Sequence, residues 1–289
     1  MRLTFLGTGT SCGVPTIGCQ CYTCTSTDPH DKRLRCSALI ETETTRVLID
    51  CGPDFRQQIM SQPFRKIDGI LITHAHYDHM GGMDDIRPYC QFGEINVYAD
   101  PIARQNMLEM LPYCFAENRY PGVPAIQLHE IHKHEPFCIG DLDIMPFEVM
   151  HHDLPILGYR ITQRSTSESR NLETSKPRNL DISKSRNNET SKPQNNAQCS
   201  LAYITDMKTI AEEEVPYVEG CDTLIVNALR QQPHHSHQTL DEAVLFAQRI
   251  AACQTWLIHS SHHIGRHAEV NASLPDNIQM AYDGQVITI

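Results

Sequence analysis

The sequence predicts an α+β fold in which stacked β-sheets are flanked by helices. The chain opens with short strand patterns rich in β-branched residues, whose spacing is typical of antiparallel hairpins. Helix patterns are mixed in with further strands only after this opening. The chain has 289 residues, 40% of them hydrophobic, which is enough for a large buried core. Together these observations favour stacked sheets over one doubly wound parallel sheet.

Strands are predicted wherever β-branched residues gather in short runs. In chain order the predicted strands are Leu3–Leu6, Ala38–Glu41, Arg46–Ile49, Gly69–Thr73, Ile95–Tyr98, Leu142–Met150, Thr223–Val226, Thr255–Ile258 and Gln285–Ile289. Helices are predicted at Asp54–Met60, Ile102–Leu111 and Thr239–Ala251. The last helix has Thr239 as its N-cap and Glu242 three residues on, which is the pattern of a capping box.

Residues 165–198 differ from the rest of the chain, because they contain almost no large apolar side chains. The stretch that starts at Ser167 recurs in similar form from Ser183, but each copy has too little apolar surface to stack as a solenoid. We therefore predict a disordered, low-complexity insertion at a loop tip within a single domain of residues 1–289. The segments Gly158–Thr162 and Ser200–Thr205 flank it and are predicted to pair as one hairpin.

Composition argues against several classes of protein. No run of 18 apolar residues occurs, so no transmembrane helix and no membrane partner are expected. The segment Met1–Gly7 lacks the apolar region and cleavage site of an export signal, which favours a cytoplasmic location. The formal charge is −11 with histidines neutral, which disfavours nucleic acid as a partner.

The cysteine and histidine content indicates metal chemistry. Twelve cysteines in a long chain without an export signal favour thiols and metal sites over a disulfide framework. Several single cysteines lie in apolar surroundings and are expected to be ordinary buried thiols: Cys90, Cys114, Cys138, Cys221 and Cys253.

A dense cluster of candidate metal ligands follows the apolar run at Gly69–Ile72. It consists of His74, His76, Asp78 and His79. His74 and His76 are two residues apart, so in extended chain they point the same way. Asp78 and His79 follow as the chain turns towards two glycines, so they can face the first pair from the other side. Nitrogen and carboxylate ligands suit zinc, manganese or iron.

This His-x-His-x-Asp-His pattern resembles the signature of the metallo-β-lactamase superfamily. Asp50, at the end of an apolar run and followed by Gly52, resembles the aspartate that supports the metal loop in that superfamily. The resemblance implies a four-layered αβ/βα sandwich with a two-metal site at its edge. It also implies three further ligands, and His151, Asp206 and His259 each end a strand pattern.

The resemblance divides these ligands between two metals. It implies that one metal is held by His74, His76 and His151, and the other by Asp78, His79 and His259, with Asp206 bridging the two. His151 and His152 are adjacent, so only one of them can follow the inward direction of its strand. We prefer His151, which leaves His152 either to contact substrate or to be solvated.

Other motifs resemble one branch of the superfamily, that of the phosphoribosyl 1,2-cyclic phosphate phosphodiesterase. They are Leu6-Gly7-Thr8-Gly9-Thr10, Gly13-Val14-Pro15, the Cys19/Cys21/Cys24 loop, His259-Ser260-Ser261-His262, Leu274-Pro275 and Tyr282-Asp283-Gly284. Three thiols within six residues favour a structural zinc. His262 is the preferred fourth ligand because it lies three residues after His259; His263 and Cys36 are the alternatives.

The expected function is that of a metal-dependent hydrolase. Two zinc or manganese ions suit attack by an activated hydroxide on a small or cyclic phosphodiester. We expect Asp78 and His237 to be the catalytic residues, with His237 as general acid, partly because the branch has a histidine at this place. The insertion is expected near the rim of this site. A ribonuclease Z-like endonuclease and a non-catalytic zinc scaffold are the alternatives, and a homodimer is compatible with the sequence.

Overall fold

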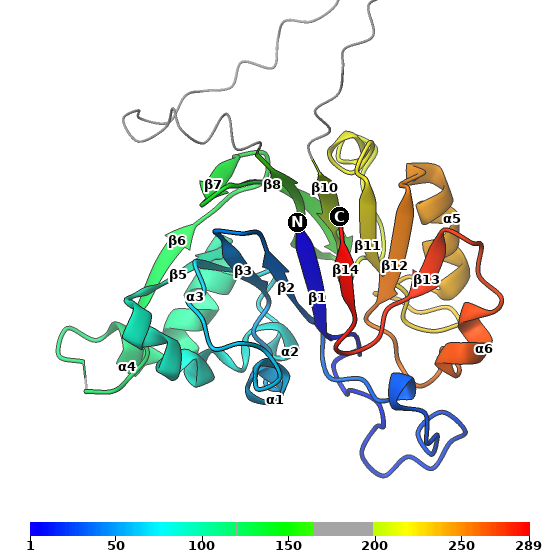
Figure 1. Cartoon of the computed structure of the whole chain (residues 1–289), viewed down its shortest axis with the longest axis horizontal. Helices are drawn as coiled ribbons and strands as arrows, with labels where there is room; N and C mark the ends of the chain where they lie inside the picture. The colour runs from blue at the N-terminus through cyan, green and yellow to red at the C-terminus, as the bar shows by residue number, and fades with distance from the viewer. Residues whose placement is uncertain (120, 165–198) are drawn as a thin grey trace, which may run out of the picture.

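The computed structural model describes residues 1–119, 121–164 and 199–289, so the predicted insertion at 165–198 lies outside the described residues. Within the described part, two seven-stranded sheets face each other (Figure 1). The helices lie on the outer sides of the two sheets, which gives the helix–sheet–sheet–helix layering of the predicted sandwich. None of the helices in these ranges is long and apolar enough to cross a membrane.

The first sheet has the strand order β14-β1-β2-β3-β4-β5-β6. Its strands are β1 (Arg2–Gly7), β2 (Ser37–Glu41), β3 (Arg46–Ile49), β4 (Gly69–Leu71), β5 (Ile95–Ala99), β6 (Ile126–Glu130) and β14 (Val286–Thr288). Pairing is antiparallel from β14 to β3 and parallel from β3 to β6. Its outer side carries α1 (Phe55–Ile59), the 3₁₀ helix η2 (Met83–Phe92), α3 (Pro101–Met110) and α4 (Pro112–Phe115). The helical turn α2 (Tyr77–Met80) lies at one edge.

The second sheet has the order β13-β12-β11-β10-β9-β8-β7. Its strands are β7 (Phe137–Ile139), β8 (Leu142–His151), β9 (Leu154–Gln163), β10 (Ser200–Tyr203), β11 (Thr223–Asn227), β12 (Gln254–Ile258) and β13 (Ile278–Met280). Its outer side is covered by α5 (Leu240–Ile250) and α6 (His267–Asn271). The two remaining 3₁₀ turns in the described ranges are η1 (Pro29–Asp31) and η4 (Val215–Tyr217).

One cluster of buried apolar side chains lies between the two sheets. Phe5 and Ile49 of the first sheet pack with Tyr159, Ile225 and Trp256 of the second. Separate clusters join each sheet to its own helices, as where Phe246 of α5 packs on the outer side of the second sheet. Burial of apolar surface on both sides of each sheet is the main favourable term for this layered arrangement.

The predicted strands and helices are all present, with ends that differ by up to two residues. The capping box at α5 is confirmed, because the Thr239 side chain accepts from the Glu242 N–H and the Glu242 side chain accepts from the Thr239 N–H. The two segments that flank the insertion do pair antiparallel, with Thr162 opposite Ser200. The prediction of buried thiols was wrong for Cys138 and Cys253, which are exposed because they lie on an edge strand and in a turn.

Candidate metal centre

The candidate ligands meet where strands of both sheets end. Asp50 and His74 follow β3 and β4, His151 ends β8, and Asp206 and His259 follow β10 and β12. Asp50, Asp206 and His259 have φ angles of 58°, 56° and 56°. This left-handed conformation costs a non-glycine residue roughly 1–2 kcal/mol, so it persists only where the surroundings hold it. At each of the three positions the turn directs the side chain into the same site.

Four ligand atoms converge on one point. One atom from each of Asp78, His79, Asp206 and His259 lies within 4.8 Å of the other three. His79 Nε2 is 3.1 Å from Asp78 Oδ2 and 3.1 Å from Asp206 Oδ2. It is buried and makes no hydrogen bond with any described residue. A buried nitrogen that faces two carboxylates without a hydrogen bond is the geometry expected of a metal ligand.

A second group of imidazoles lies beside the first. His74 Nε2 is 3.0 Å from His76 Nδ1, and the His76 ring lies 5.2 Å from the ring of His151. His151 Nδ1 donates to the Ser236 carbonyl at 2.8 Å, which leaves its Nε2 free. One ligand atom from each of His151, Asp206 and His237 also lies within 4.8 Å of the others. Asp206 is therefore shared by two candidate ligand groups, one with Asp78, His79 and His259 and the other with His151 and His237.

Asp50 orients the loop that carries the candidate ligands His74, His76, Asp78 and His79. Its Oδ2 accepts a hydrogen bond from His79 Nδ1 at 2.7 Å. The N–H and hydroxyl of Thr73 also donate to its carboxylate. Because Nδ1 of His79 is held in this way, Nε2 is the nitrogen that faces Asp78 and Asp206. Outer partners of this kind fix the ring orientation and tautomer of metal-binding histidines.

The electrostatics of the cluster suit a cation. Burial lowers the pKa of His74, and it lowers the pKa of His259 to about 3, so both rings are neutral and keep a free lone pair. Burial alone would raise the pKa of Asp206, but the imidazoles of His259 and His79 outweigh it and hold this pKa well below its usual range. Burial alone would lower the pKa of His79, but the Asp206, Asp50 and Asp78 carboxylates outweigh it and raise this pKa.

The donor set therefore fits divalent metal ions. Three carboxylates face His79, and without a metal only the proton on its ring offsets their charge. A divalent cation would replace that proton and satisfy the buried His79 Nε2. Imidazole nitrogen and carboxylate oxygen ligands suit zinc and manganese.

The cysteine loop forms a separate candidate site. One ligand atom from each of Cys19, Cys21, Cys24 and His262 lies within 4.8 Å of the others. His262 Nδ1 is 3.4 Å from Cys19 Sγ and 3.2 Å from Cys21 Sγ. Hydrogen bonds from the Cys24 N–H and from His262 lower the pKa of Cys21 to about 6, so its thiolate is accessible at neutral pH.

The two alternative fourth ligands are not part of this group. His263 is exposed, and its ring lies tilted against that of His262 without joining the three thiols. Cys36 lies in the core between the sheets, where burial raises the pKa of its thiol well above the ordinary value. The structure therefore brings the three predicted cysteines together with the preferred histidine.

His237 is buried beside the metal ligands. Its Nε2 is 2.9 Å from Asp206 Oδ1, and its ring stacks on the ring of His259 at 5.0 Å. His152, by contrast, points outward and pairs with Asp153 at 2.9 Å.

Thr10 was missed by the sequence analysis as a site residue, and its hydroxyl lies 3.1 Å from His259 Nε2. The only sequence signal for it is its place in the Gly-Thr-Gly-Thr turn after β1.

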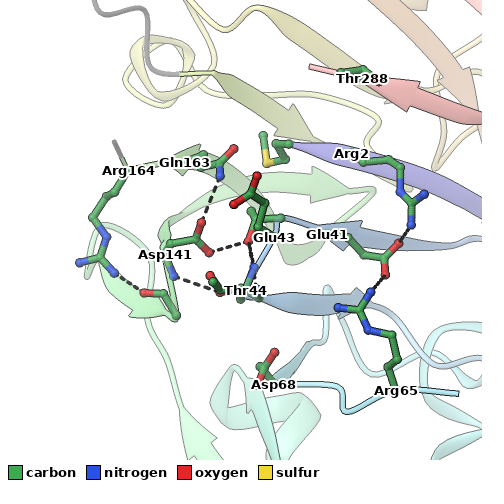
Figure 2. Close-up of a pocket in the computed structure, with 14 residues that line it drawn as sticks. Arg2, Glu41, Glu43, Thr44, Arg65, Asp68, Asp141, Gln163, Arg164 and Thr288 are labelled. Atoms are coloured by element: carbon green, nitrogen blue, oxygen red, sulfur yellow. Dashed lines mark hydrogen bonds and ion pairs between the residues drawn. The ribbon is translucent and has the colours of Figure 1, made fainter. Parts of the chain in front are cut away.

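A large cavity lies at the opposite end of the strands. It has a volume of about 1010 Å³ and is lined by Arg2 at the start of β1 and by Gln163 and Arg164 at the end of β9 (Figure 2). Arg2 and Arg65 both pair with Glu41 on one side of it (Figure 2). None of the predicted site residues lines this cavity.

The prediction that the insertion lies near the rim of the metal site concerns residues outside the described structure, but the structure shows the positions of the residues that flank it. Arg164 and Cys199 bound the residues outside the structure, and both lie at the end of the β9–β10 pair that is far from Asp206. Asp206 follows Ser200 by six positions, which corresponds to roughly 20 Å of extended chain. The two points where the insertion is attached therefore lie far from the metal ligands, while the place of residues 165–198 themselves stays a prediction.

Comparison with known proteins identifies a family. The family described as "Beta-lactamase superfamily domain" matches residues 45–169 and 194–260. A Porphyromonas gingivalis protein named octanoyltransferase is 39% identical over 286 residues, which is 98% of this chain and 51% of that protein. A ribonuclease Z from Thermosynechococcus vestitus is 28% identical over 169 residues, which is 56% of this chain and 37% of that protein. The chain thus spans about half, or less, of the length of these curated relatives.

Solved structures agree with the family match. A new diphosphatase from the PhnP family has 33% sequence identity and a TM-score of 0.80, and the match covers 100% of this chain and 97% of that one. The short form of human tRNase Z has 18% identity and a TM-score of 0.67, covering 100% of this chain and 99% of that one. At this lower identity, the second likeness shows the fold alone.

Proposed function

Because this chain belongs to the metallo-β-lactamase superfamily, we propose that it is a metal-dependent hydrolase that acts on a small or cyclic phosphodiester. One observation carries the proposal. Ligand atoms of Asp78, His79, Asp206 and His259 converge within 4.8 Å around a buried His79 nitrogen that has no hydrogen bond in the described structure. The similarity to a diphosphatase of the PhnP family supports phosphorus as the reacting centre.

We assign His74, His76 and His151 to one divalent ion, and Asp78, His79 and His259 to a second, with Asp206 shared. Two such ions would supply hydroxide at neutral pH and would offset the charge that develops on the phosphoryl oxygens. The protein holds the ligands rigidly, since Asp50 fixes the His79 ring and the Ser236 carbonyl fixes the His151 ring. Among the three carboxylates that face His79, Asp78 is the least buried, which supports a catalytic role for it.

His237 is the proposed general acid. Its Nε2 lies on the site side, 2.9 Å from Asp206, and its Nδ1 lies 3.0 Å from the Ser236 hydroxyl. The ring is therefore held between two polar groups beside the candidate metal ligands, which is a position suited to a proton donor. Proton donation to that oxygen is worth about 10²- to 10⁴-fold in rate when the leaving group is a poor one.

The cysteine loop is proposed to hold one structural zinc. Three thiols and one imidazole form a closed set of four ligands, which is typical of structural rather than catalytic zinc. His262 lies three residues after His259, so a metal here would also fix the segment that carries a ligand of the active centre.

An RNA endonuclease is the second candidate, because several relatives are named ribonuclease Z. The net charge of −11 disfavours it, since an RNA substrate requires a basic surface. The insertion carries six Lys or Arg and four Asp or Glu, a net charge of only +2. Its attachment points also lie away from the metal ligands.

A substrate panel distinguishes the two candidates. The protein, loaded with zinc or manganese, would be assayed on bis(p-nitrophenyl) phosphate, on cyclic ribose phosphates and on precursor tRNA. We expect turnover of the small diesters, highest for a cyclic one, and no cleavage of the tRNA. Efficient tRNA cleavage without turnover of cyclic diesters would support the endonuclease. The absence of turnover on every substrate, with metal bound, would support a scaffold.

A further inference from the structure

The carboxylate of Asp283 accepts three hydrogen bonds from two distant segments. Its Oδ1 accepts from the Thr8 N–H at 2.9 Å and from the Thr8 hydroxyl at 2.7 Å. Its Oδ2 accepts from the Leu34 N–H at 2.6 Å. Asp283 is itself anchored beside β1, because the Gly284 N–H donates to the Phe5 carbonyl. Both carboxylate oxygens are therefore in use.

Arg33 completes the network from the other side. It is almost fully buried, and its Nη1 donates to the Thr8 hydroxyl and to the Ala281 carbonyl, each at 2.7 Å. The Thr8 hydroxyl thus accepts from Arg33 and donates to Asp283. The Leu34 carbonyl accepts from the Gly9 N–H at 2.7 Å, so the chain is held on both sides of Thr8 and Gly9. We call Arg33, Thr8 and Asp283 the Thr8 network.

The segment held by this network lies against His259. The Ser260 N–H donates to the Thr8 carbonyl at 3.0 Å, and the Thr10 N–H donates to the Ser260 carbonyl at 3.2 Å. The Thr10 hydroxyl reaches His259 Nε2 at 3.1 Å. His259 has a φ of 56°, a conformation that a histidine keeps only where its neighbours are held. The two backbone bonds restrain Ser260, the residue that follows His259. The Thr10 hydroxyl contacts His259 Nε2, which is the ring nitrogen that faces Asp206.

We propose that the Thr8 network positions His259 and thereby sets the affinity of the histidine and carboxylate centre for its metal. The inference rests on the proposed metal centre and adds to it three residues that touch neither metal nor substrate. The hydrogen bonds of the network use both carboxylate oxygens of Asp283. An asparagine at position 283 offers only one acceptor oxygen, so either the Thr8 N–H or the Leu34 N–H would lose its partner. The Thr8–Thr10 segment would then shift relative to Ser260.

Manganese binding tests the proposal, because Mn²⁺ prefers nitrogen and oxygen ligands to thiolates and so reports on this centre alone. The affinity of the metal-stripped protein for Mn²⁺ would be measured by electron paramagnetic resonance for the wild type and for Asp283→Asn. We expect a Kd about 10- to 100-fold higher in the variant, as is typical when an outer partner of a metal ligand is removed. Saturating Mn²⁺ should restore most of kcat, which a general folding defect would not allow.

Asp222→Asn is the matched control. Asp222 accepts from the N–H and hydroxyl of one residue, Ser200, at 2.8 and 3.1 Å, as Asp283 does from Thr8. Asp222 directly precedes β11, beside the start of β10 and away from the metal ligands, so the Mn²⁺ affinity of this variant should equal that of the wild type. If Asp283→Asn fails to fold, Thr8→Val removes only the hydroxyl contacts and should raise the Kd several-fold.

The outcomes separate this inference from the proposed function. Unchanged Mn²⁺ affinity in Asp283→Asn, or in Thr8→Val where that is the variant that folds, would overturn the positioning role. An equal loss in Asp222→Asn would overturn it as well, because the effect would then be general. A wild-type protein that binds no Mn²⁺ and shows no turnover with any metal would instead overturn the proposed metal centre, and this inference with it.

Discussion

At the scale of single residues, Asp206 has the largest expected effect. Its Oδ2 faces His79, and its Oδ1 faces both His237 and His259. We predict that Asp206→Ala lowers kcat by more than about 100-fold, because both proposed metals would lose a ligand. This loss is larger than the one expected when only a hydrogen-bond partner of a metal ligand is removed. The fold should survive, since the residue lies at the edge of a large core. His152→Ala, which changes an exposed neighbouring histidine, should stay near wild type. Circular dichroism and kinetics check both variants.

His237 gives a second prediction at this scale. His237→Ala should lower kcat for an alkyl or ribose diester by about 10²- to 10⁴-fold, because the leaving alkoxide needs a proton. The loss should be much smaller for bis(p-nitrophenyl) phosphate, whose leaving group is stable as an anion. The ratio of kcat values on the two substrates is the measurement. Equal losses on both would indicate that His237 binds substrate or metal instead of donating a proton.

The metal ligands that residue types and spacing reveal without the family resemblance are those that lie close together in the chain. His74, His76, Asp78 and His79 lie within six positions, so their pattern survives without any knowledge of the fold. Thr10 and Asp283 contact the centre or its support only because loops distant in the chain meet. Both loops belong to motifs that resemble the family branch, but the sequence does not indicate which partners Thr10 and Asp283 contact. Long-range hydrogen bonds of this kind become visible only in three dimensions.

At the scale of elements, the cysteine loop should behave as part of the fold. The sulfur of Cys19 and the ring of His262 are 243 positions apart in the chain, so a metal between them closes a very long loop. We predict that mild chelation removes activity first and leaves about one zinc per chain. Cys21→Ser should lose that zinc and lower the melting temperature by roughly 2–8 °C, which corresponds to about 1–2 kcal/mol.

Metal analysis and calorimetry on the same samples check this prediction, with Cys253→Ser as a control because its thiol is exposed and is not one of the four ligands. Cys253→Ser should keep both its zinc and its melting temperature. A Cys21→Ser protein that also kept both would contradict the structural site.

Helices and strands were easiest to predict where the residue types favour the element and the element is long enough to show its pattern. The α5 helix has a capping box and an apolar face, and both features are local. Three strands were missed, and all of them lie at or near sheet edges: β6, β7 and β13. β7 and β13 have only three residues each, and β6 carries Gln, His and Glu, so the usual β-branched run is absent. These strands form because a neighbouring strand offers hydrogen bonds, which is a tertiary effect.

At the scale of the whole molecule, strand direction separates two ends of the sandwich. The ends of β3, β4, β8, β10 and β12 bring the candidate ligands to one edge. The start of β1 and the end of β9 lie at the other, beside the large cavity (Figure 2). The candidate metal ligands and the attachment points of residues 165–198 therefore lie at opposite ends of the strands. Changes at one end should leave the other intact.

Deletion of residues 165–198 tests this separation. The Gln163 N–H donates to the Cys199 carbonyl at 3.0 Å, so the β9 and β10 ends are close enough to be joined by a short Asn-Gly type turn. We predict an unchanged kcat and kcat/KM on small diesters, and a melting temperature within a few degrees of wild type, because a shorter loop has a lower closure entropy. Replacement of the segment by a Gly/Ser linker of equal length serves as the control for loop length. A deletion that lost activity but kept its melting temperature and its bound metal would mean that these residues contact substrate, and it would favour the endonuclease over the small-diester hydrolase.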